Sequence, residues 1–400
     1  MTRTPKLVAL AMALTLAVSS ASIALDREPA EASGVSTQTS SLAAQQQARR
    51  TTGRIAFAPA PVGQKRSDRK AGLTPGTVRF SPARPGAGVR IERLVRGKWL
   101  KAATTTQDKR GRARFNVRAV KPGNTSKYRA VTSPGKGKRN VATPTVVPRA
   151  QTRVFVDGFD SAAKYRKQWK TRNKGMYHGR RMCAAPSPSR VAVINGSARL
   201  SVKQVGRKGR PSPAKRSFKC VGGIWHNAMV GTGRAAKPFS FRYGTAAARV
   251  KFQPGQGMHS GFWLQAMGAG GAEIDIAEYY GNGYWAGLQS KIHQTLPNGG
   301  LRTHGGTMNL SPVLARGKTP ASGWHVYSVE WTPKRYVFRV DGVVTMVTSR
   351  PHVSTAQQEV VMSLLTSDWA LDDRVLKTKS SSKVAVDWVQ VWQDPKHIGQ

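Results

Sequence analysis

Residues 272–280 read Ala-Glu-Ile-Asp-Ile-Ala-Glu-Tyr-Tyr, and they constrain the fold more than any other part of the chain. The alternation of Ile274 and Ile276 with acidic residues is typical of a β-strand, whose side chains point to opposite faces in turn. Glu273 and Asp275 then share one face, and the isoleucines enter the core on the other. Such a strand belongs in a sheet with one buried face and one open face.

A third acid, Glu278, breaks this alternation. Strict alternation would place Glu278 on the core side, where an unpaired carboxylate is costly to bury. One extra residue near Ile276 or Ala277, a β-bulge, would return Glu278 to the face of Glu273. We therefore expect three carboxylates on one open surface, in a chain with only 19 Asp and Glu residues against 65 Lys and Arg residues.

Three acids placed in this way fit the hydrolysis of glycosidic bonds. Retaining cleavage uses a nucleophilic carboxylate and a carboxylic acid about 5–5.5 Å apart. The Cα atoms of Glu273 and Glu278 should lie about 13 Å apart, so two long side chains that lean inward can close the gap. Repulsion among the carboxylates should keep at least one of them protonated near neutral pH. A solvated acidic strand face is the alternative, but the flanking sequence offers Trp263, Tyr279 and Tyr280 in place of Arg or Lys.

The hexapeptide Glu-Ile-Asp-Ile-Ala-Glu resembles the bulged ExDxxE signature of glycoside hydrolase family 16. Flanking blocks agree in order: 261–264 before the motif, 325–333 with 338–342 as a later hairpin, and 386–392 as a closing strand. The resemblance covers residues 154–393. It implies a concanavalin A-like β-jelly roll with a concave cleft.

The resemblance also implies roles for the acids. Glu273 would be the nucleophile, Glu278 the general acid and base, and Asp275 would orient Glu273 and keep the proton affinity of Glu278 high. The bulged motif is similar to that of laminarinases, agarases and carrageenases, so we expect a secreted retaining endo-glycosidase, with a β-1,3-glucan as the first substrate to test. Alternatives that stay open are a hydrolase of an acidic or sulfated galactan, a transglycosylase, and a non-catalytic protein that binds cell wall or polysaccharide.

Aromatic and histidine side chains are candidates for sugar contacts. Trp263, Trp285 and Trp369 could stack on the apolar faces of sugar rings, and core packing is the alternative for each of them. His293 resembles a cleft histidine of the family, with a structural role as its alternative. His259, which we place in a loop at 255–259, is a weaker candidate.

The resemblance further implies a structural calcium ion held by Asp387 in the closing strand, with backbone carbonyls near the start of the domain and at the turn that contains Gly196. Calcium takes six to eight oxygen ligands, and Asp387 is the one convincing carboxylate. We expect catalysis itself to require no cofactor.

Trp331 and Trp388 alternate with polar residues in their strands and are predicted to lie in the core.

Residues 1–32 are typical of a secretory signal peptide. Two positive charges precede the apolar run 7–18, and cleavage is expected after Ala24 or Ala32. A membrane anchor is the alternative, although the run is short for a membrane span.

The two cysteines, Cys183 and Cys220, fit an exported protein with one disulfide. The loop that this disulfide closes would contribute about 4 kcal/mol to stability.

The remaining chain is predicted to be all-β, because helical periodicity is weak and Val, Thr, Trp and Tyr recur at short intervals. Residues 33–53 are rich in Ser, Thr, Gln and Ala and are predicted to form a flexible linker. Residues 54–148 contain short strands separated by turns, which indicates a small β-sandwich and resembles the immunoglobulin-like modules of secreted bacterial proteins. Residues 154–393 are predicted to form the catalytic domain.

The formal net charge is +46. Residues 1–150 contain 29 basic and 6 acidic residues, and the rest contain 36 and 13, so the excess belongs to the whole chain. An anionic cell-wall polymer or an acidic polysaccharide is one explanation, and a compositional bias without a partner is the other. Nucleic acid is the weakest candidate, because no helix-turn-helix or zinc-finger pattern occurs.

Overall fold

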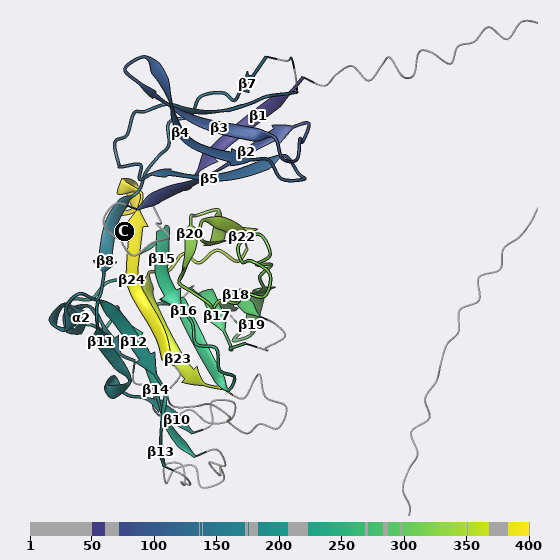
Figure 1. Ribbon diagram of the computed structural model, residues 1–400. Helices are drawn as coiled ribbons and strands as arrows, with labels where there is room; N and C mark the ends of the chain where they lie inside the picture. The colour runs from purple at the N-terminus through teal and green to yellow at the C-terminus, as the bar shows by residue number, and fades with distance from the viewer. Residues whose placement is uncertain are drawn as a thin grey trace, which may run out of the picture. The chain divides into compact units, whose positions relative to one another are not determined.

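The computed structural model describes residues 50–60, 72–135, 137, 139–172, 175, 183–206, 223–268, 271–282, 287–296, 298–349, 351–367 and 383–399. This part of the chain is almost entirely β-structure, as predicted (Figure 1). None of its helices has the length and apolar character needed to span a membrane. The predicted signal peptide, most of the predicted linker, Trp285, Trp369 and Cys220 lie outside the described residues.

The first domain is a small β-sandwich made of two antiparallel sheets. One sheet has the order β1 (Thr52–Phe57), β2 (Leu73–Ser81) and β5 (Arg112–Arg118); the other has the order β4 (Lys98–Thr106), β3 (Gly88–Val95), β6 (Tyr128–Thr132) and β7 (Val141–Ala142). Alternate residues of both sheets, including Val78, Ile91 and Phe115, form a separate buried cluster. The predicted strands are therefore confirmed, while the immunoglobulin-like character of the module stays a resemblance.

The predicted boundary between linker and sandwich is wrong by two residues. The linker was expected to extend to residue 53, but β1 already begins at Thr52, which pairs with Ser81 of β2. Gly53 lies over the ring of Phe80, where an added Cβ would come within 2.5 Å of the ring. A glycine in a Ser- and Thr-rich stretch suggested a linker, whereas here it admits a close neighbour on the adjacent strand.

The second domain contains two larger sheets. The nine-stranded sheet has the order β10 (Ala184–Pro186), β14 (Ile224–Gly231), β23 (Gln358–Thr366), β16 (Met258–Ala266), β17 (Ala272–Tyr279), β18 (Leu288–Thr295) and β19 (Leu301–Thr307), with β13 (Lys203–Gly206) and β9 (Lys170–Thr171) also paired to β14. The eight-stranded sheet has the order β11 (Val191–Ile194), β12 (Ser197–Ser201), β24 (Lys383–Gln393), β15 (Gly244–Lys251), β20 (His325–Trp331), β21 (Arg335–Val340) and β22 (Val343–Ser349), with β8 (Thr152–Asp157) paired to β24. Together they form the expected jelly roll.

Three short helical segments lie between or after these strands in the described residues. They are α2 (Ala162–Gln168), η2 (Pro188–Arg190) and η4 (Pro395–His397). The side chain of Ser161 caps α2 by accepting a hydrogen bond from the backbone N–H of Lys164 at 3.2 Å. The β11–β12 hairpin turns at Asn195 and Gly196, whose φ angles of 49° and 64° are those of the tight turn that an Asn-Gly pair favours.

One core is built from the inner faces of both large sheets. Ile274 and Ile276 of β17 are buried in it together with Trp331 of β20, and full burial of a large apolar side chain stabilises by about 1.5–3 kcal/mol. Trp388 is fully buried in a smaller cluster with Trp392. The predicted core positions of the isoleucines and of both tryptophans are confirmed. The opposite face of the nine-stranded sheet is therefore the one left for a site.

Only one of the two predicted disulfide partners, Cys183, lies among the described residues. Cys183 is buried and is not a free thiol. Cys220 and the basic loop 207–219 lie outside the described residues. The Cys183–Cys220 bridge therefore stays a prediction.

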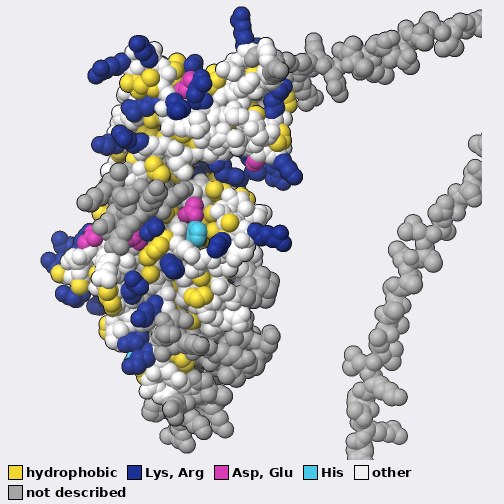
Figure 2. Space-filling model, viewed as in Figure 1, with side chains coloured by type: hydrophobic (Ala, Val, Ile, Leu, Met, Phe, Trp, Pro, Cys, Tyr) yellow, Lys and Arg dark blue, Asp and Glu magenta, His cyan; other side chains and the backbone are white. Residues whose placement is uncertain are grey.

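Basic side chains are spread over the visible surface. Figure 2 shows Lys and Arg side chains scattered widely and far outnumbering Asp and Glu. This distribution agrees with the even division of charge along the sequence and marks no single basic patch on that face.

Candidate active site

The acid-bearing strand β17 contains the predicted bulge. Against the neighbouring strand β16, Ala277 pairs with Phe262 and Asp275 pairs with Trp263, so that Ile276 is the extra residue. The pairing of β17 with β18 is interrupted at the same place. The bulge reverses the alternation and brings the third acid to the face of the first two.

All three acids line one cavity of about 330 Å³ on the nine-stranded sheet. Glu273, Asp275 and Glu278 share its walls with Trp263 and His259 of β16. Further wall residues come from β14 and β23. The fold thus brings the three carboxylates together in an open cleft, as predicted.

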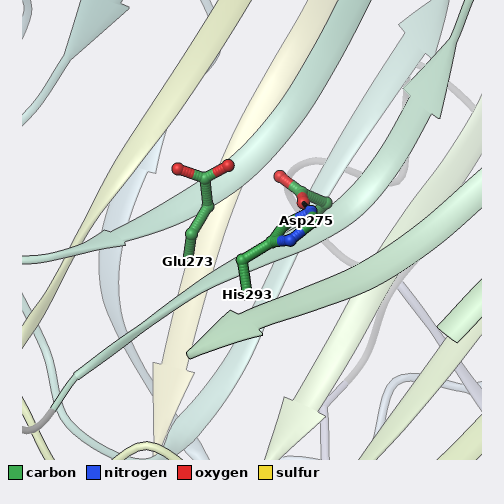
Figure 3. Close-up of side chains that lie close together, drawn as sticks. All are labelled: Glu273, Asp275 and His293. Carbon is green, nitrogen blue, oxygen red and sulfur yellow. Dashed lines mark ion pairs between the residues drawn. The ribbon is translucent and has the colours of Figure 1, made fainter. Parts of the chain in front are cut away.

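Asp275 is held by His293 from the neighbouring strand β18. The Nε2 atom of His293 lies 3.3 Å from Oδ2 of Asp275 (Figure 3). Its Nδ1 atom lies 2.9 Å from the Thr303 hydroxyl, which fixes the ring. Glu273 lies beside them, with one donor atom from each of the three residues within 4.8 Å of the others. These three atoms fall short of the six to eight oxygens that calcium takes, and two of them already pair, so we assign no metal here.

Glu278 has three partners in the cleft. His259 Nε2 lies 2.8 Å from Glu278 Oε1, and Lys291 Nζ lies 3.3 Å from Oε2. The Tyr280 hydroxyl donates to Oε1 at 3.3 Å. The flanking sequence offers no Arg or Lys to the acids, but β16 and β18 bring His259 and Lys291 in from the two sides of β17.

These partners set the charge of Glu278. Burial by itself raises the pKa of this carboxyl, but the hydrogen bond and charge of His259, together with the ammonium of Lys291, outweigh burial and lower the pKa to about 2. Repulsion from Asp275 was expected to keep the proton affinity of Glu278 high, and in the free protein that expectation is wrong. His259 and Lys291 lie directly on the carboxylate oxygens, whereas Asp275 is not among the groups that shift the pKa most, so these two partners dominate.

His259 was also placed in the wrong kind of element. The residues Gly-Gln-Gly before it suggested a loop up to residue 259, but β16 begins at Met258. His259 pairs with Leu365 of β23, in the interior of the sheet. Only knowledge of which strands are neighbours would have identified His259 as a contact of Glu278.

Trp263 lies between the cleft and a buried cluster. It lines the cleft, and it packs against a small cluster formed by Met229, Val361 and Leu365. Its Nε1–H donates to the Ser363 hydroxyl at 3.2 Å. One face of the ring is already covered by a guanidinium group 5.0 Å from the ring centroid, which limits the area left for a sugar.

That guanidinium belongs to Arg172, which sequence reasoning missed. Arg172 follows β9, and its Nε atom lies 3.2 Å from Oε1 of Glu359. A second cavity of about 390 Å³ adjoins the acid-lined one, sharing Arg172 and Gln265, and it is also lined by Lys170 and Arg234. The cleft thus has a basic extension, which no local sequence signal marked.

The surroundings of Asp387 do not fit the implied calcium ion. Asp387 is 1 % exposed, and Arg249 Nη1 lies 2.8 Å from its Oδ2 atom. A guanidinium occupies the position next to the carboxylate and repels a second cation. Asp387 is therefore one half of a buried ion pair between β15 and β24.

A two-sheet β-sandwich whose open face carries three carboxylates in a cleft defines a carbohydrate-cleaving enzyme of the jelly-roll class. The sequence model of Glycosyl hydrolases family 16 matches residues 187–390, about half of the chain. The chain belongs to this family and is a glycoside hydrolase.

The known proteins that resemble this chain in sequence or fold have low sequence identity to it. Gram-negative bacteria-binding protein 3 of Drosophila melanogaster is 26 % identical over 225 residues, which are 47 % of this chain and 44 % of that protein, so the match spans less than half of the relative. The laminarinase catalytic domain of Thermotoga maritima is 16 % identical, with a TM-score of 0.48 over 61 % of this chain and 98 % of that one. The endo-β-1,3-glucanase of Pyrococcus furiosus is 17 % identical, with a TM-score of 0.47 over 60 % and 94 %.

Proposed function

We propose that this protein is a secreted, retaining endo-glycosidase that hydrolyses β-linked polysaccharide, with a β-1,3-glucan as the preferred substrate to test. The observation that carries the proposal is the bulge at Ile276, which places Glu273, Asp275 and Glu278 in one cleft. A solvated acidic surface would need neither a bulge nor buried acids, yet Asp275 and Glu278 are both buried.

The proposed reaction has two steps. The carboxylate of Glu273 attacks the anomeric carbon while Glu278 delivers a proton to the leaving oxygen, and a covalent glycosyl-enzyme forms. Glu278 then removes a proton from water as the water attacks the same carbon and releases Glu273. Asp275, held by His293, lies on the same strand face between the two glutamates and helps to orient Glu273.

The roles of the two glutamates are tested by substitution and azide rescue. Glu273→Gln and Glu278→Gln should each reduce the release of reducing ends from polysaccharide to a small fraction of the wild-type rate. With an activated aryl glycoside, azide should rescue Glu273→Ala and give a product of inverted configuration, because azide replaces the nucleophile. Azide should rescue Glu278→Ala with retention, because it replaces the water.

Glu330→Gln is the matched control for these variants. Glu330 lies on β20 in the other sheet and pairs with Arg339 at 2.7 Å, so this substitution should leave turnover unchanged. Wild-type-like activity in pure Glu273→Gln or Glu278→Gln protein would contradict the proposal.

The linkage and the fate of the intermediate need separate measurements. A panel of soluble β-1,3-, β-1,4- and mixed-linkage glucans and of galactans identifies the substrate by its kcat/KM. Product analysis at high acceptor concentration separates hydrolysis from transglycosylation, because both reactions pass through the same covalent intermediate. We place the β-1,3-glucan first because the bulged motif resembles that of laminarinases.

An acidic polysaccharide is the second candidate, favoured by the basic extension of the cleft. Lys170 and Arg234 are exposed there beside the Arg172–Glu359 pair. Cations at this point would attract a carboxylated or sulfated sugar. If such a substrate is preferred, Arg234→Gln should raise its KM, high salt should do the same, and a neutral glucan should be unaffected by both.

A binding protein without turnover is the third candidate. The Drosophila relative is named for bacteria binding, and the excess positive charge suits an anionic cell-wall polymer. Binding of that kind should weaken steeply with salt, because each contact releases counterions. Salt-sensitive retention of the full-length chain on anionic polymer, with no reducing ends released from any substrate, would favour this candidate over the enzyme.

Secretion is tested at the N-terminus. Export with removal of residues 1–24 or 1–32 should leave a mature chain that begins at Leu25 or Ser33, as N-terminal sequencing of the protein in the culture medium would reveal. A chain retained at the membrane with Met1 intact would instead support the anchor.

A further inference from the structure

The general acid of the proposed reaction has unusual surroundings. Glu278 must carry a proton to the glycosidic oxygen, yet an ammonium and an imidazole stand against its two oxygens. An isolated carboxylic acid would keep its proton best in an apolar pocket. The proton delivered to the substrate therefore needs another place to reside before the reaction.

We propose that His259 holds this proton and passes it to Glu278, so that the two residues act as one proton-carrying pair. The inference rests on the proposed function, because it concerns how the acid of that reaction is supplied. His259 is then a positioning and proton-storing residue that acts through Glu278.

The geometry of the pair supports this role. His259 Nε2 lies 2.8 Å from Glu278 Oε1, and both side chains are less than one-tenth exposed. The imidazole lies flat on the ring of Tyr280, with centroids 4.3 Å apart and planes inclined by 3°. Tyr280 also donates its hydroxyl to the same Oε1 atom at 3.3 Å. Tyr280 thus fixes both the plane of the imidazole and the position of the Glu278 oxygen that the imidazole contacts.

The other charged groups around the pair act differently. Lys291 on β18 contacts Oε2 of Glu278 through its ammonium group. Glu273 and Asp275 on β17 and Arg172 beyond β9 line the same cavity. Histidine is the side chain whose charge changes near neutral pH, so His259 is the member of the set suited to giving up and recovering a proton during turnover.

The proton balance of the step is complete. Before reaction His259 is an imidazolium and Glu278 a carboxylate. The proton moves from Nε2 to Oε1 and then to the glycosidic oxygen as the bond to the anomeric carbon breaks and the Glu273 carboxylate bonds to that carbon. The leaving sugar departs as a neutral alcohol. When water attacks, its proton passes to Glu278 and back to His259, and the bond to Glu273 breaks.

The test compares pH–rate profiles of the full-length wild type and His259→Gln. In the wild type, the alkaline limb of kcat/KM reports loss of the proton from the pair. Without the imidazole, Lys291 still favours the carboxylate, so the acid loses its proton at lower pH. We expect the alkaline limb of His259→Gln to move down by about one pH unit or more.

A change of leaving group provides a second readout. A 4-nitrophenolate leaves without protonation, so a fault in proton supply matters little for the 4-nitrophenyl glycoside of the same oligosaccharide. We expect His259→Gln to lose at least about tenfold more activity on polysaccharide than on this aryl glycoside. His304→Gln, on β19 outside the cleft lining, is the matched control and should change neither readout.

Lys291→Gln gives the opposite sign and serves if His259→Gln fails to fold. Removing the fixed ammonium raises the proton affinity of the pair, so the alkaline limb should move to higher pH. An unmoved limb in Lys291→Gln, or in His259→Gln an unmoved limb with equal losses on both substrates, would overturn the inference. Glu278→Gln distinguishes failure of the proposed function from failure of the role given to His259. If Glu278→Gln is active, the proposed function fails; if it is inactive, only the role of His259 is in question.

Discussion

Two nearly buried glutamates, one in each domain, show how a structural carboxylate differs from a functional one. Glu92 of the sandwich is 5 % exposed at its side chain and lies 2.7 Å from both Arg90 and Arg129. Glu278 of the jelly roll is 7 % exposed and lies against His259 and Lys291. Both have a lowered pKa, for the same electrostatic reason.

The difference lies in the partners and in access. Arginine keeps its charge and binds a carboxylate through fixed, planar donors, so neither partner of Glu92 can supply it with a proton. Glu278 faces a cleft and touches an imidazole that can exchange one. The same contrast separates Asp387, paired with Arg249, from Asp275, paired with His293. In this protein, the partner of a buried acid indicates its role better than its burial does.

The largest expected effect separates the two glutamates by activity. Glu278→Gln should lower kcat/KM on the preferred polysaccharide by about 10²–10⁴-fold, the usual contribution of general acid catalysis. Glu92→Gln should leave kcat/KM unchanged, because Glu92 contacts no part of the cleft. Initial-rate assays, with circular dichroism to verify folding, measure both, and equal losses in the two variants would break the comparison.

The next effect concerns the buried pair in the jelly roll. Arg249→Met removes the cation and leaves Asp387 buried, which should lower the free energy of unfolding by about 3–5 kcal/mol. Urea titration followed by tryptophan fluorescence measures this loss. A change below about 1 kcal/mol would mean that Asp387 does not depend on Arg249.

A smaller effect is expected in the sandwich. Glu92→Gln leaves two arginines without their carboxylate, and because both are partly exposed to water the loss of stability should be about 1–3 kcal/mol. Thermal unfolding monitored by calorimetry measures the shift in Tm. A variant as stable as the wild type would show that water replaces the carboxylate without cost.

The pH dependence of stability sharpens the same point. The folded pKa of Glu92 lies below its unfolded value of about 4.5, because the hydrogen bonds and charges of Arg129 and Arg90 outweigh burial, which by itself raises the pKa. Its contribution to stability is therefore present above pH 4.5 and is lost as the pH falls through the folded pKa. The stability difference between wild type and Glu92→Gln should shrink between pH 5 and pH 3, as urea titrations at several pH values would measure. A constant difference would contradict the pairing.

The smallest effect is expected on metal removal. Because Asp387 pairs with Arg249, chelation with EDTA should leave the Tm of the jelly roll unchanged, and added calcium should not raise it. A rise of several degrees on adding calcium would show that oxygen ligands elsewhere in the chain form a site.

The sequence predicted the parts of the site that local pattern governs. Alternation and the cost of burying Glu278 were enough to predict both the bulge and the shared face of the acids. The core positions of Trp331 and Trp388 followed from local rules in the same way. These features depend on residues within a few positions of one another.

The parts that were missed depend on strand neighbours far away in the chain. Lys291 reaches Glu278 from β18, and Arg172 reaches Trp263 from a segment about ninety residues earlier. The wrong expectation for the protonation of Glu278 followed directly, because it counted only the charges on its own strand. His259 was placed in a loop and ranked as a weaker candidate, because two nearby glycines concealed the start of β16.

The central claim is that Glu273 forms the covalent bond to sugar, and trapping that bond tests it most directly. The protein is incubated with an activated 2-deoxy-2-fluoro glycoside of the oligosaccharide it cleaves, digested, and examined by mass spectrometry. The account predicts one glycosylated peptide, with the sugar on Glu273 and no adduct in Glu273→Gln. An adduct on Glu278, Asp275 or any other residue, or rapid turnover of the natural substrate by Glu273→Gln, would contradict it.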